Sequence, residues 1–112
     1  MLLESDKTRL HHMLEAAEEA VVFSTNRRRS DLDEDRQFQL ALVRGLEIIG
    51  EAASRMSEAA RSDCPHIPWS RMVSARNRLG HVYFDVDLDI VWQTVTQELP
   101  ALIREIKAVL NV

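Results

Sequence analysis

Apolar residues recur at steps of three and four positions along most of this chain, which is the period of one face of an α-helix. The first stripe starts after Asp6 and consists of Leu10, Met13, Leu14, Ala17 and Val21. Only three Gly and three Pro interrupt the 112 residues, and the β-branched residues are scattered rather than alternating. Strands would need that alternation. The chain is therefore predicted to be all-helical.

A second, longer helix is predicted after a polar connection at residues 26–30. Candidate N-cap residues from Ser30 to Asp35 mark its start. Its main stripe consists of Phe38, Leu42, Leu46, Ile49, Ala53 and Met56. Leu40, Val43 and Ile48 widen the apolar surface beyond one face, so this helix is expected to pack on two sides.

Two Pro residues divide the middle of the chain. Residues 57–63 are predicted to form a short helical turn that ends at Cys64-Pro65. Pro68 suits the first turn of a third helix, expected from Trp69 to about Leu79, and Gly80 is suited to end it.

The last helix is expected to start at a cap provided by Asp85 or Asp87. Its apolar positions are Ile90, Val91, Val95, Leu99, Leu102, Ile106 and Val109. Pro100 lies inside this pattern and should kink or split the helix. The fold class that follows is an all-α, up-down bundle of four or five helices in a single domain, residues 1–112.

Charge and hydropathy limit the environment in which the chain can act. Fourteen basic and eighteen acidic residues give a net charge of −4, which disfavours a general nucleic-acid coat protein. Twelve of the basic residues are Arg, the better residue for planar phosphate recognition, so local basic sites remain possible. The longest uncharged run, residues 90–97, is too short to span a bilayer, and the charged N-terminus is unlike a signal peptide. A cytoplasmic protein is expected.

Few residues outside the third helix invite a functional interpretation. Cys64 is the only cysteine, and a polar turn without an activating partner favours a structural thiol over a catalytic one. The adjacent His11 and His12 make a poor metal pair. Residues 27–29 are three consecutive Arg, which either contact phosphates or form a solvated loop. No metal or cofactor site is predicted.

The densest group of reactive side chains lies at residues 76–83. Asn77 and His81 are four positions apart and would touch on a continuous helix. Arg76 and His81 are five apart, so on a straight helix they would diverge by about 140°. Joint action would need unwinding near Gly80, or a second copy of the chain to complete the site.

These residue types suffice for RNA cleavage without a metal. A His with an ordinary pKa of ~6.5 can transfer protons, and a fixed Arg can stabilise charge that develops on phosphorus. Asn77 could orient the imidazole or donate to a phosphate oxygen. The alternative interpretation is structural: His81 complements the helix dipole, and Arg76 and Arg78 are ordinary solvated residues.

Several segments, in order along the chain, resemble the HepT-like toxin family of the HEPN (higher eukaryotes and prokaryotes nucleotide-binding) superfamily. They are Leu14-Glu15-Ala16-Ala17, Leu46-Glu47-Ile48-Ile49-Gly50-Glu51-Ala52, Pro65-His66-Ile67-Pro68-Trp69, Arg76-Asn77-x-x-x-His81-x-Tyr83-Phe84, Val91-Trp92 and Leu99-Pro100-x-Leu102. The chain departs from the family at Ser74-Ala75, where relatives often have Gly-Met, and at Gly80, where an aliphatic residue is frequent.

The resemblance implies a homodimer of helical bundles whose Arg/His motifs form a shared cleft. It implies a metal-independent RNA endonuclease, the toxin of a toxin–antitoxin module, held in check by a cognate minimal nucleotidyltransferase antitoxin. By position, Arg76 and His81 would be catalytic with Asn77 in support, and Tyr83 would accept AMP from the antitoxin. The competing hypothesis is a non-catalytic, nucleotide-binding or docking subunit of a nucleotidyltransferase complex.

Overall fold

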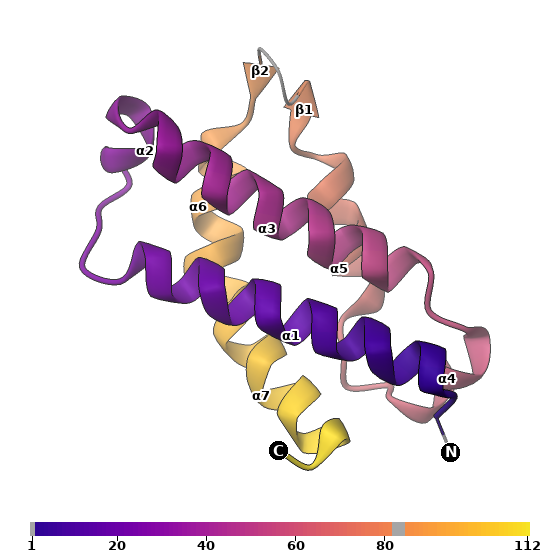
Figure 1. The fold of residues 1–112 in the computed structure, drawn as a ribbon. Coiled ribbons are helices and arrows are strands. Elements are labelled where there is room, and N and C mark those ends of the chain that lie inside the picture. Colours follow the sequence, from indigo (N-terminus) through magenta and orange to yellow (C-terminus); the bar gives the residue numbers. More distant parts are fainter. Residues whose placement is uncertain (1, 82–84) are drawn as a thin grey trace.

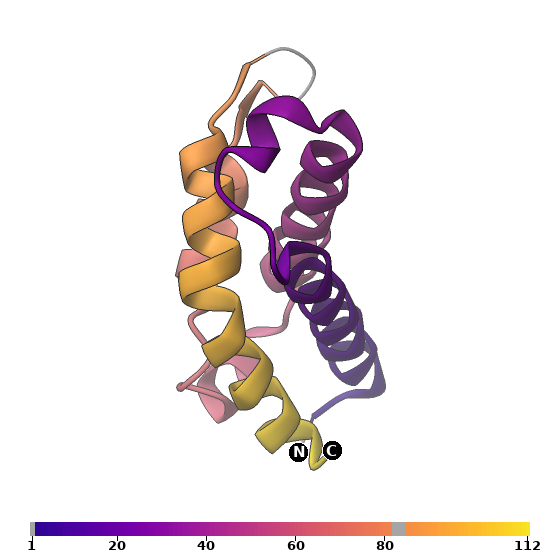
Figure 2. The ribbon, with the colours of Figure 1, turned by 90° about the vertical axis from the view of Figure 1, so that its left-hand side faces the viewer.

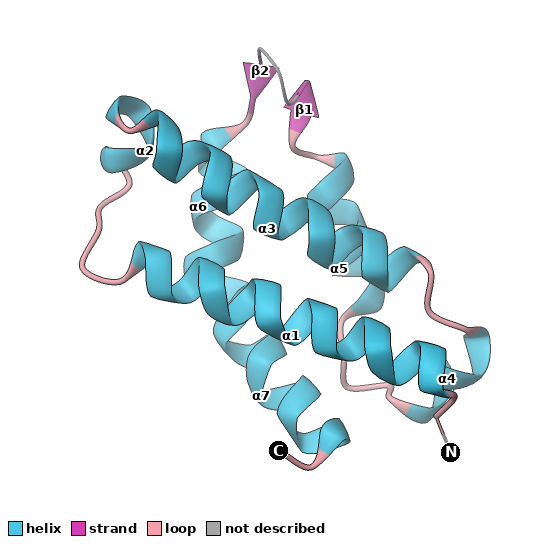
Figure 3. Ribbon diagram, in the orientation of Figure 1, coloured by secondary structure: helices cyan, strands magenta, loops and turns pink. Residues whose placement is uncertain are grey.

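A computed structural model of the chain describes residues 2–81 and 85–112. Its helices are α1 (Glu4–Ser24), α2 (Asp31–Glu34), α3 (Arg36–Ser54), α4 (Glu58–Asp63), α5 (Trp69–Asn77), α6 (Leu88–Gln93), the π-helix η1 (Thr94–Glu98) and α7 (Leu99–Leu110). Two short strands, β1 (Gly80–His81) and β2 (Asp85–Val86), pair antiparallel at one end of the molecule (Figure 3). The all-helical prediction is confirmed, and the short strand pair is an addition to it.

The long helices form two crossing layers. Antiparallel α1 and α3 make one layer, and α5 together with the continuous rod α6–η1–α7 makes the other (Figures 1 and 2). Helix α3 packs against both α1 and α5, and α7 packs against α1. Helix α5 runs towards the β1–β2 pair, and α6 leads away from it (Figure 1). None of the described helices combines the length and apolar character needed to cross a membrane.

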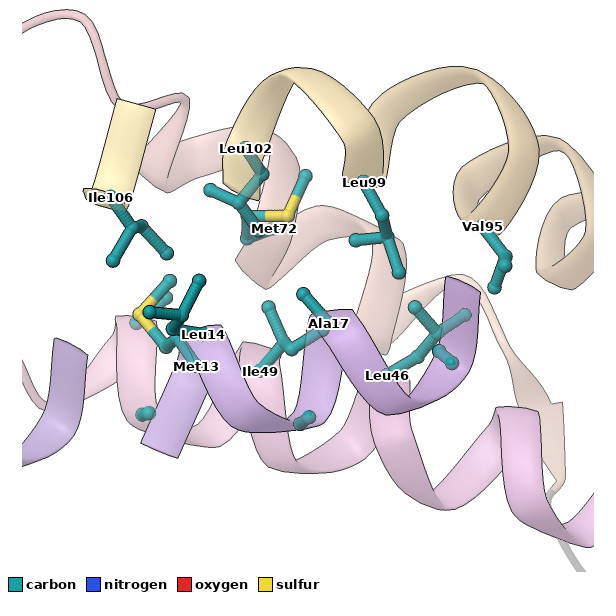
Figure 4. Close-up of a cluster of buried hydrophobic side chains, with 14 of the residues drawn as sticks. Met13, Leu14, Ala17, Leu46, Ile49, Met72, Val95, Leu99, Leu102 and Ile106 are labelled. Atoms are coloured by element: carbon teal, nitrogen blue, oxygen red, sulfur yellow. The ribbon is translucent and has the colours of Figure 1, made fainter. Parts of the chain in front are cut away.

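The predicted apolar stripes meet between the layers. Figure 4 shows a part of this core, with side chains from α1, α3, α5, η1 and α7. Its largest fully buried members include Leu10, Met13, Leu42, Ile49, Met72, Leu99, Leu102 and Ile106. Packing of α3 on two sides is confirmed by Val43, which is buried. Leu40 does not take part in this packing. It lies one turn before the exposed Arg44 and is itself 48% exposed.

Short polar residues begin the helices where the sequence places them. The Asp35 carboxylate accepts a hydrogen bond from the Phe38 N–H at 3.1 Å and caps α3. Asp87, rather than Asp85, caps α6 by accepting from two backbone N–H groups at 3.1 Å. Near Pro100, where a kink or split was expected, the helix changes type without a gap: the π-helix η1 lies directly before α7, and Pro100 lies in the first turn of α7.

Asp6 joins the start of α1 to the start of α4. It is 1% exposed, and its carboxylate accepts from the Ser57 hydroxyl at 2.7 Å and the Ser57 N–H at 3.1 Å. The Ser57 hydroxyl in turn accepts from the Ala60 N–H and caps α4. These two Ser57 hydrogen bonds, with help from Arg9, lower the pKa of Asp6 although burial opposes the shift.

Asp6 should therefore make stability depend on pH in the acid range. Because its folded pKa lies below the unfolded value, its contribution is complete above about pH 4 and is lost as pH falls through the folded pKa. Asp6→Asn is expected to lower the free energy of unfolding at pH 7 by about 1–3 kcal/mol, since it breaks charge-assisted hydrogen bonds. Urea denaturation between pH 7 and about pH 3 should show a shallower acid loss in this variant than in wild type.

Asp33→Asn is the matched control, because the Asp33 carboxylate is 58% exposed and, among the described residues, pairs with Arg29 alone. It should keep the wild-type stability and acid dependence. If the free energy of unfolding fell equally with pH in Asp6→Asn and in wild type, this would contradict the role assigned to Asp6.

Candidate functional site

Arg76 occupies the last turn of α5, where its side-chain stem lies directly on the backbone of α3. A Cβ atom added to Gly50 would collide with the Arg76 Cβ and would lie 3.0 Å from its Cδ. Glycine at position 50 therefore permits the close approach of α5 to α3. This approach delivers the Arg76 guanidinium to the C-terminal turn of α3.

The guanidinium is held from two sides. Its Nη1 donates to the Glu51 carboxylate at 3.0 Å and lies 3.4 Å from the Ser54 hydroxyl. Its Nε and Nη2 both donate to the Asn77 Oδ1 at 3.3 Å. The Arg76 side chain nevertheless remains 28% exposed, so an anion in solution can reach it.

Asn77 is joined to Arg76 by this arrangement. Its amide oxygen accepts from the guanidinium, and no described residue accepts from its amide N–H groups, so these exposed donors can serve an external acceptor. This geometry is compatible with donation to a phosphate oxygen, one of the two roles that the sequence left open for Asn77. The structure thus brings two of the residues expected in the site into direct contact.

His81 does not share a helical face with Asn77, which corrects the expectation based on a continuous helix. Helix α5 ends at Asn77, and Gly80 takes a φ of +87°, a conformation that favours glycine. The Asp87 N–H donates to the Leu79 carbonyl at 2.9 Å, so the chain turns into the β1–β2 pair instead of a further helical turn. The helix therefore ends before Gly80, which is one of the two conditions named above for joint action of Arg76 and His81.

The backbone of His81 pairs with that of Asp85 in the strand pair. The side chain of His81 lies outside the described part of the chain, and so does Tyr83, which falls within residues 82–84.

Glu51 contacts the candidate site, and sequence reasoning did not single it out. Its two carboxylate oxygens are divided between two arginines: one accepts from the Arg55 Nε at 2.7 Å and the other from Arg76. The hydrogen bond and charge of Arg55, and then the charge of Arg76, lower the pKa of Glu51, so the carboxylate is ionised at neutral pH. Because Glu51 and Arg76 are 25 residues apart, no local spacing rule could have paired them.

Two grooves flank this arginine–carboxylate cluster. A groove of about 360 Å³ between the end of α3 and α5 is lined by Ser54, Arg61, Ser70, Val73, Ser74 and Asn77. Another, of about 430 Å³, lies between α1 and α3 and reaches Glu51 and Arg55. Arg76 contacts side chains that line both grooves, so an extended polymer in either one would pass close to it.

Arg27, Arg29 and Cys64 have structural roles. Arg27 pairs with Asp35 at 2.9 Å and stacks on the Phe38 ring, and Arg29 pairs with Asp89 at 2.8 Å. These contacts use both side chains within the fold instead of leaving them for phosphates. Cys64 is buried, and burial raises the pKa of its thiol, as suits a structural residue. Among residues 2–81 and 85–112, no three His, Cys, Asp or Glu side chains gather into a possible metal site.

Comparison with known proteins gives a consistent picture. The family model described as "Ribonuclease HepT-like" matches residues 13–109. A "Putative RNase" of Methanocaldococcus jannaschii is 32% identical over 103 residues, which cover 92% of this chain and 94% of the relative. A "Putative RNase" of Caldanaerobacter subterraneus subsp. tengcongensis is 31% identical, with 97% of each chain covered. A "Probable ribonuclease HepT" of Thermococcus cleftensis is 41% identical over 68 residues, 61% of this chain and 62% of the relative. No solved structure gives a significant match.

The two glycines of α3 provide a test of the close helix approach. Gly50→Ala should lower the free energy of unfolding by about 1–3 kcal/mol, because its methyl group would push α5 away from α3. Gly45→Ala is the matched control: its methyl group would make ordinary contacts at 3.6 Å, and Ala should add up to about 1 kcal/mol through helix propensity. Chemical denaturation of both variants measures this difference. Equal effects of the two substitutions would contradict a special role for Gly50.

Proposed function

Because this chain belongs to the HepT-like ribonuclease family, we propose that it is the toxin of a toxin–antitoxin module and acts as a metal-independent RNA endonuclease in the cytoplasm. In this proposal Arg76 and His81 are the catalytic residues, and Asn77 supports Arg76. The observation that carries the proposal is the anchored Arg76 guanidinium, which is held by Glu51 and Asn77 and still accessible.

The proposed reaction uses the RNA's own 2′-hydroxyl as the nucleophile. His81 in its neutral form accepts the 2′-hydroxyl proton while the oxygen attacks the adjacent phosphorus. Arg76 and the Asn77 amide stabilise the negative charge that develops on the phosphate oxygens. The bond from phosphorus to the 5′-oxygen then breaks, the leaving oxygen takes a proton from water, and the protonated His81 returns its proton to water. The products are a 2′,3′-cyclic phosphate and a 5′-hydroxyl.

We further propose that the active form is a homodimer in which the motifs of two protomers share one cleft. Its antitoxin is proposed to be a cognate minimal nucleotidyltransferase that transfers AMP to Tyr83. Each added phosphate would bring negative charge next to the RNA-binding surface and repel the substrate.

Cleavage of RNA by purified protein in the presence of EDTA tests the catalytic assignment. Wild-type protein should cleave, and Arg76→Ala and His81→Ala should each lower the rate by about 100-fold or more. His81→Ala should leave thermal unfolding little changed, whereas Arg76→Ala also removes the stem that packs on Gly50 and should lower the melting temperature. Arg78→Ala is the matched control, because Arg78 is exposed just after α5 and no described residue forms an ion pair with it. Full activity of both Arg76→Ala and His81→Ala would remove the site assignment. An inactive, unmodified wild-type protein would favour the non-catalytic docking subunit.

Expression in cells tests the toxin and its proposed control. Wild-type chain produced without the nucleotidyltransferase should arrest growth, and His81→Ala should relieve the arrest. Co-expression with the nucleotidyltransferase should restore growth and add mass in AMP-sized steps. Tyr83→Phe should stay unmodified and resist neutralisation. Added AMP on Tyr83→Phe, measured by intact mass, would place the acceptor elsewhere.

A further inference from the structure

We propose that Glu51 is a positioning residue, which holds the Arg76 guanidinium in the orientation that binds the scissile phosphate of RNA. The inference rests on the ribonuclease function proposed above and adds a residue to its site. Glu51 belongs to α3, whereas the Arg/His motif lies after it on α5 and β1.

The hydrogen bonds of Arg76 show what this orientation is. Of the five N–H groups of a guanidinium, the Nε–H and one on Nη2 donate to Asn77, and one on Nη1 donates to Glu51. The second Nη1 N–H has only the longer, 3.4 Å contact with Ser54. The second Nη2 N–H has no partner among the described residues. The guanidinium is therefore fixed with donors left for an incoming phosphate.

Glu51 and Asn77 contribute differently to this fixation. Asn77 follows Arg76 on the same helix and moves with it, so its contact alone cannot hold the guanidinium relative to the rest of the bundle. Glu51 ties the guanidinium to α3, the helix that packs against both α1 and α5. The contact at Gly50 fixes the stem of Arg76 one residue away. Both the stem and the guanidinium of Arg76 are thus held by α3.

Loss of this ion pair should change the orientation of the Arg76 guanidinium more than the stability of the fold. The two side chains are 28% and 53% exposed, and ion pairs at such exposure contribute about 0–1 kcal/mol to folding. Loss of the carboxylate should therefore leave the fold intact while it frees the Arg76 head. A misplacement of about 1 Å at a reacting group can cost about 100-fold in rate.

Arg55 resolves the objection that a carboxylate would repel RNA. It donates to the second oxygen of Glu51 at 2.7 Å, so the cluster of Arg55, Glu51 and Arg76 has a net charge of +1. The lowered pKa of Glu51 keeps the carboxylate ionised. The cluster can thus hold Arg76 in place and still attract a phosphate.

Steady-state RNA cleavage by Glu51→Gln tests the proposal. The expected result is a fall in kcat of about 10- to 100-fold, with KM and the melting temperature little changed. Glu51→Asp should recover part of the lost rate, because it restores the charge. Glu47→Gln is the matched control: it removes a carboxylate one turn earlier on α3, and Glu47 forms no ion pair with any described residue. Equal kcat values for Glu51→Gln and Glu47→Gln would overturn the proposal.

A second measurement reads the position of Arg76 without any activity. The NMR signal of its Nε–H group, assigned by its loss in Arg76→Lys, should show a restrained guanidinium in wild type and Glu47→Gln and a freely rotating one in Glu51→Gln. Unchanged restraint in Glu51→Gln would overturn the proposal even if the rate fell. A wild-type chain that cleaves no RNA but holds Arg76 in this way would overturn the ribonuclease function, and with it the catalytic purpose of the anchor.

Discussion

The contact of α5 with α3 at Gly50 is the constraint on which the candidate site depends. Two helices of a bundle ordinarily keep about 8–10 Å between their axes, with side chains filling the space. At Gly50 the missing side chain lets the stem of Arg76 take that space instead. The arginine is then part of the helix packing and part of the site at once. The Arg76 guanidinium is consequently brought to Glu51 by the same contact that packs α5 against α3.

Local rules predicted the helices well. The caps at Asp35, Ser57 and Asp87 lie where short polar residues precede apolar stripes, and each satisfies a backbone N–H group that the helix itself leaves unpaired. Leu40 shows the limit of such reasoning, because an apolar residue near the edge of a wide stripe can face either a neighbour or solvent. Only the positions of the other helices decide between them.

The site could be predicted only in part, for a physical reason. Arg76, Asn77 and His81 are close in sequence, so the motif itself was visible. The pairing of Arg76 with Glu51 depends on how two helices pack across 25 residues of chain, and sequence spacing carries no such information. The same holds for Arg29 and Asp89, which are 60 residues apart. The strand pair after α5 was missed because it depends on the positive φ of Gly80 and on pairing with β2, further along the chain.

The π-helix between α6 and α7 has a consequence for how the last rod meets the core. Val91, Val95 and Leu99 are spaced by four residues, and on a regular α-helix each such step rotates a side chain by about 40° around the axis. By Leu99 the stripe would have turned well away from its starting direction. A π-helix closes its hydrogen bonds over one more residue per turn, so it absorbs this rotation. All three side chains stay at 0–1% exposure as a result. The wider turn therefore keeps the apolar side chains of the continuous rod on a single face. This face packs against α2 and α3 at one end of the rod and against α1 at the other.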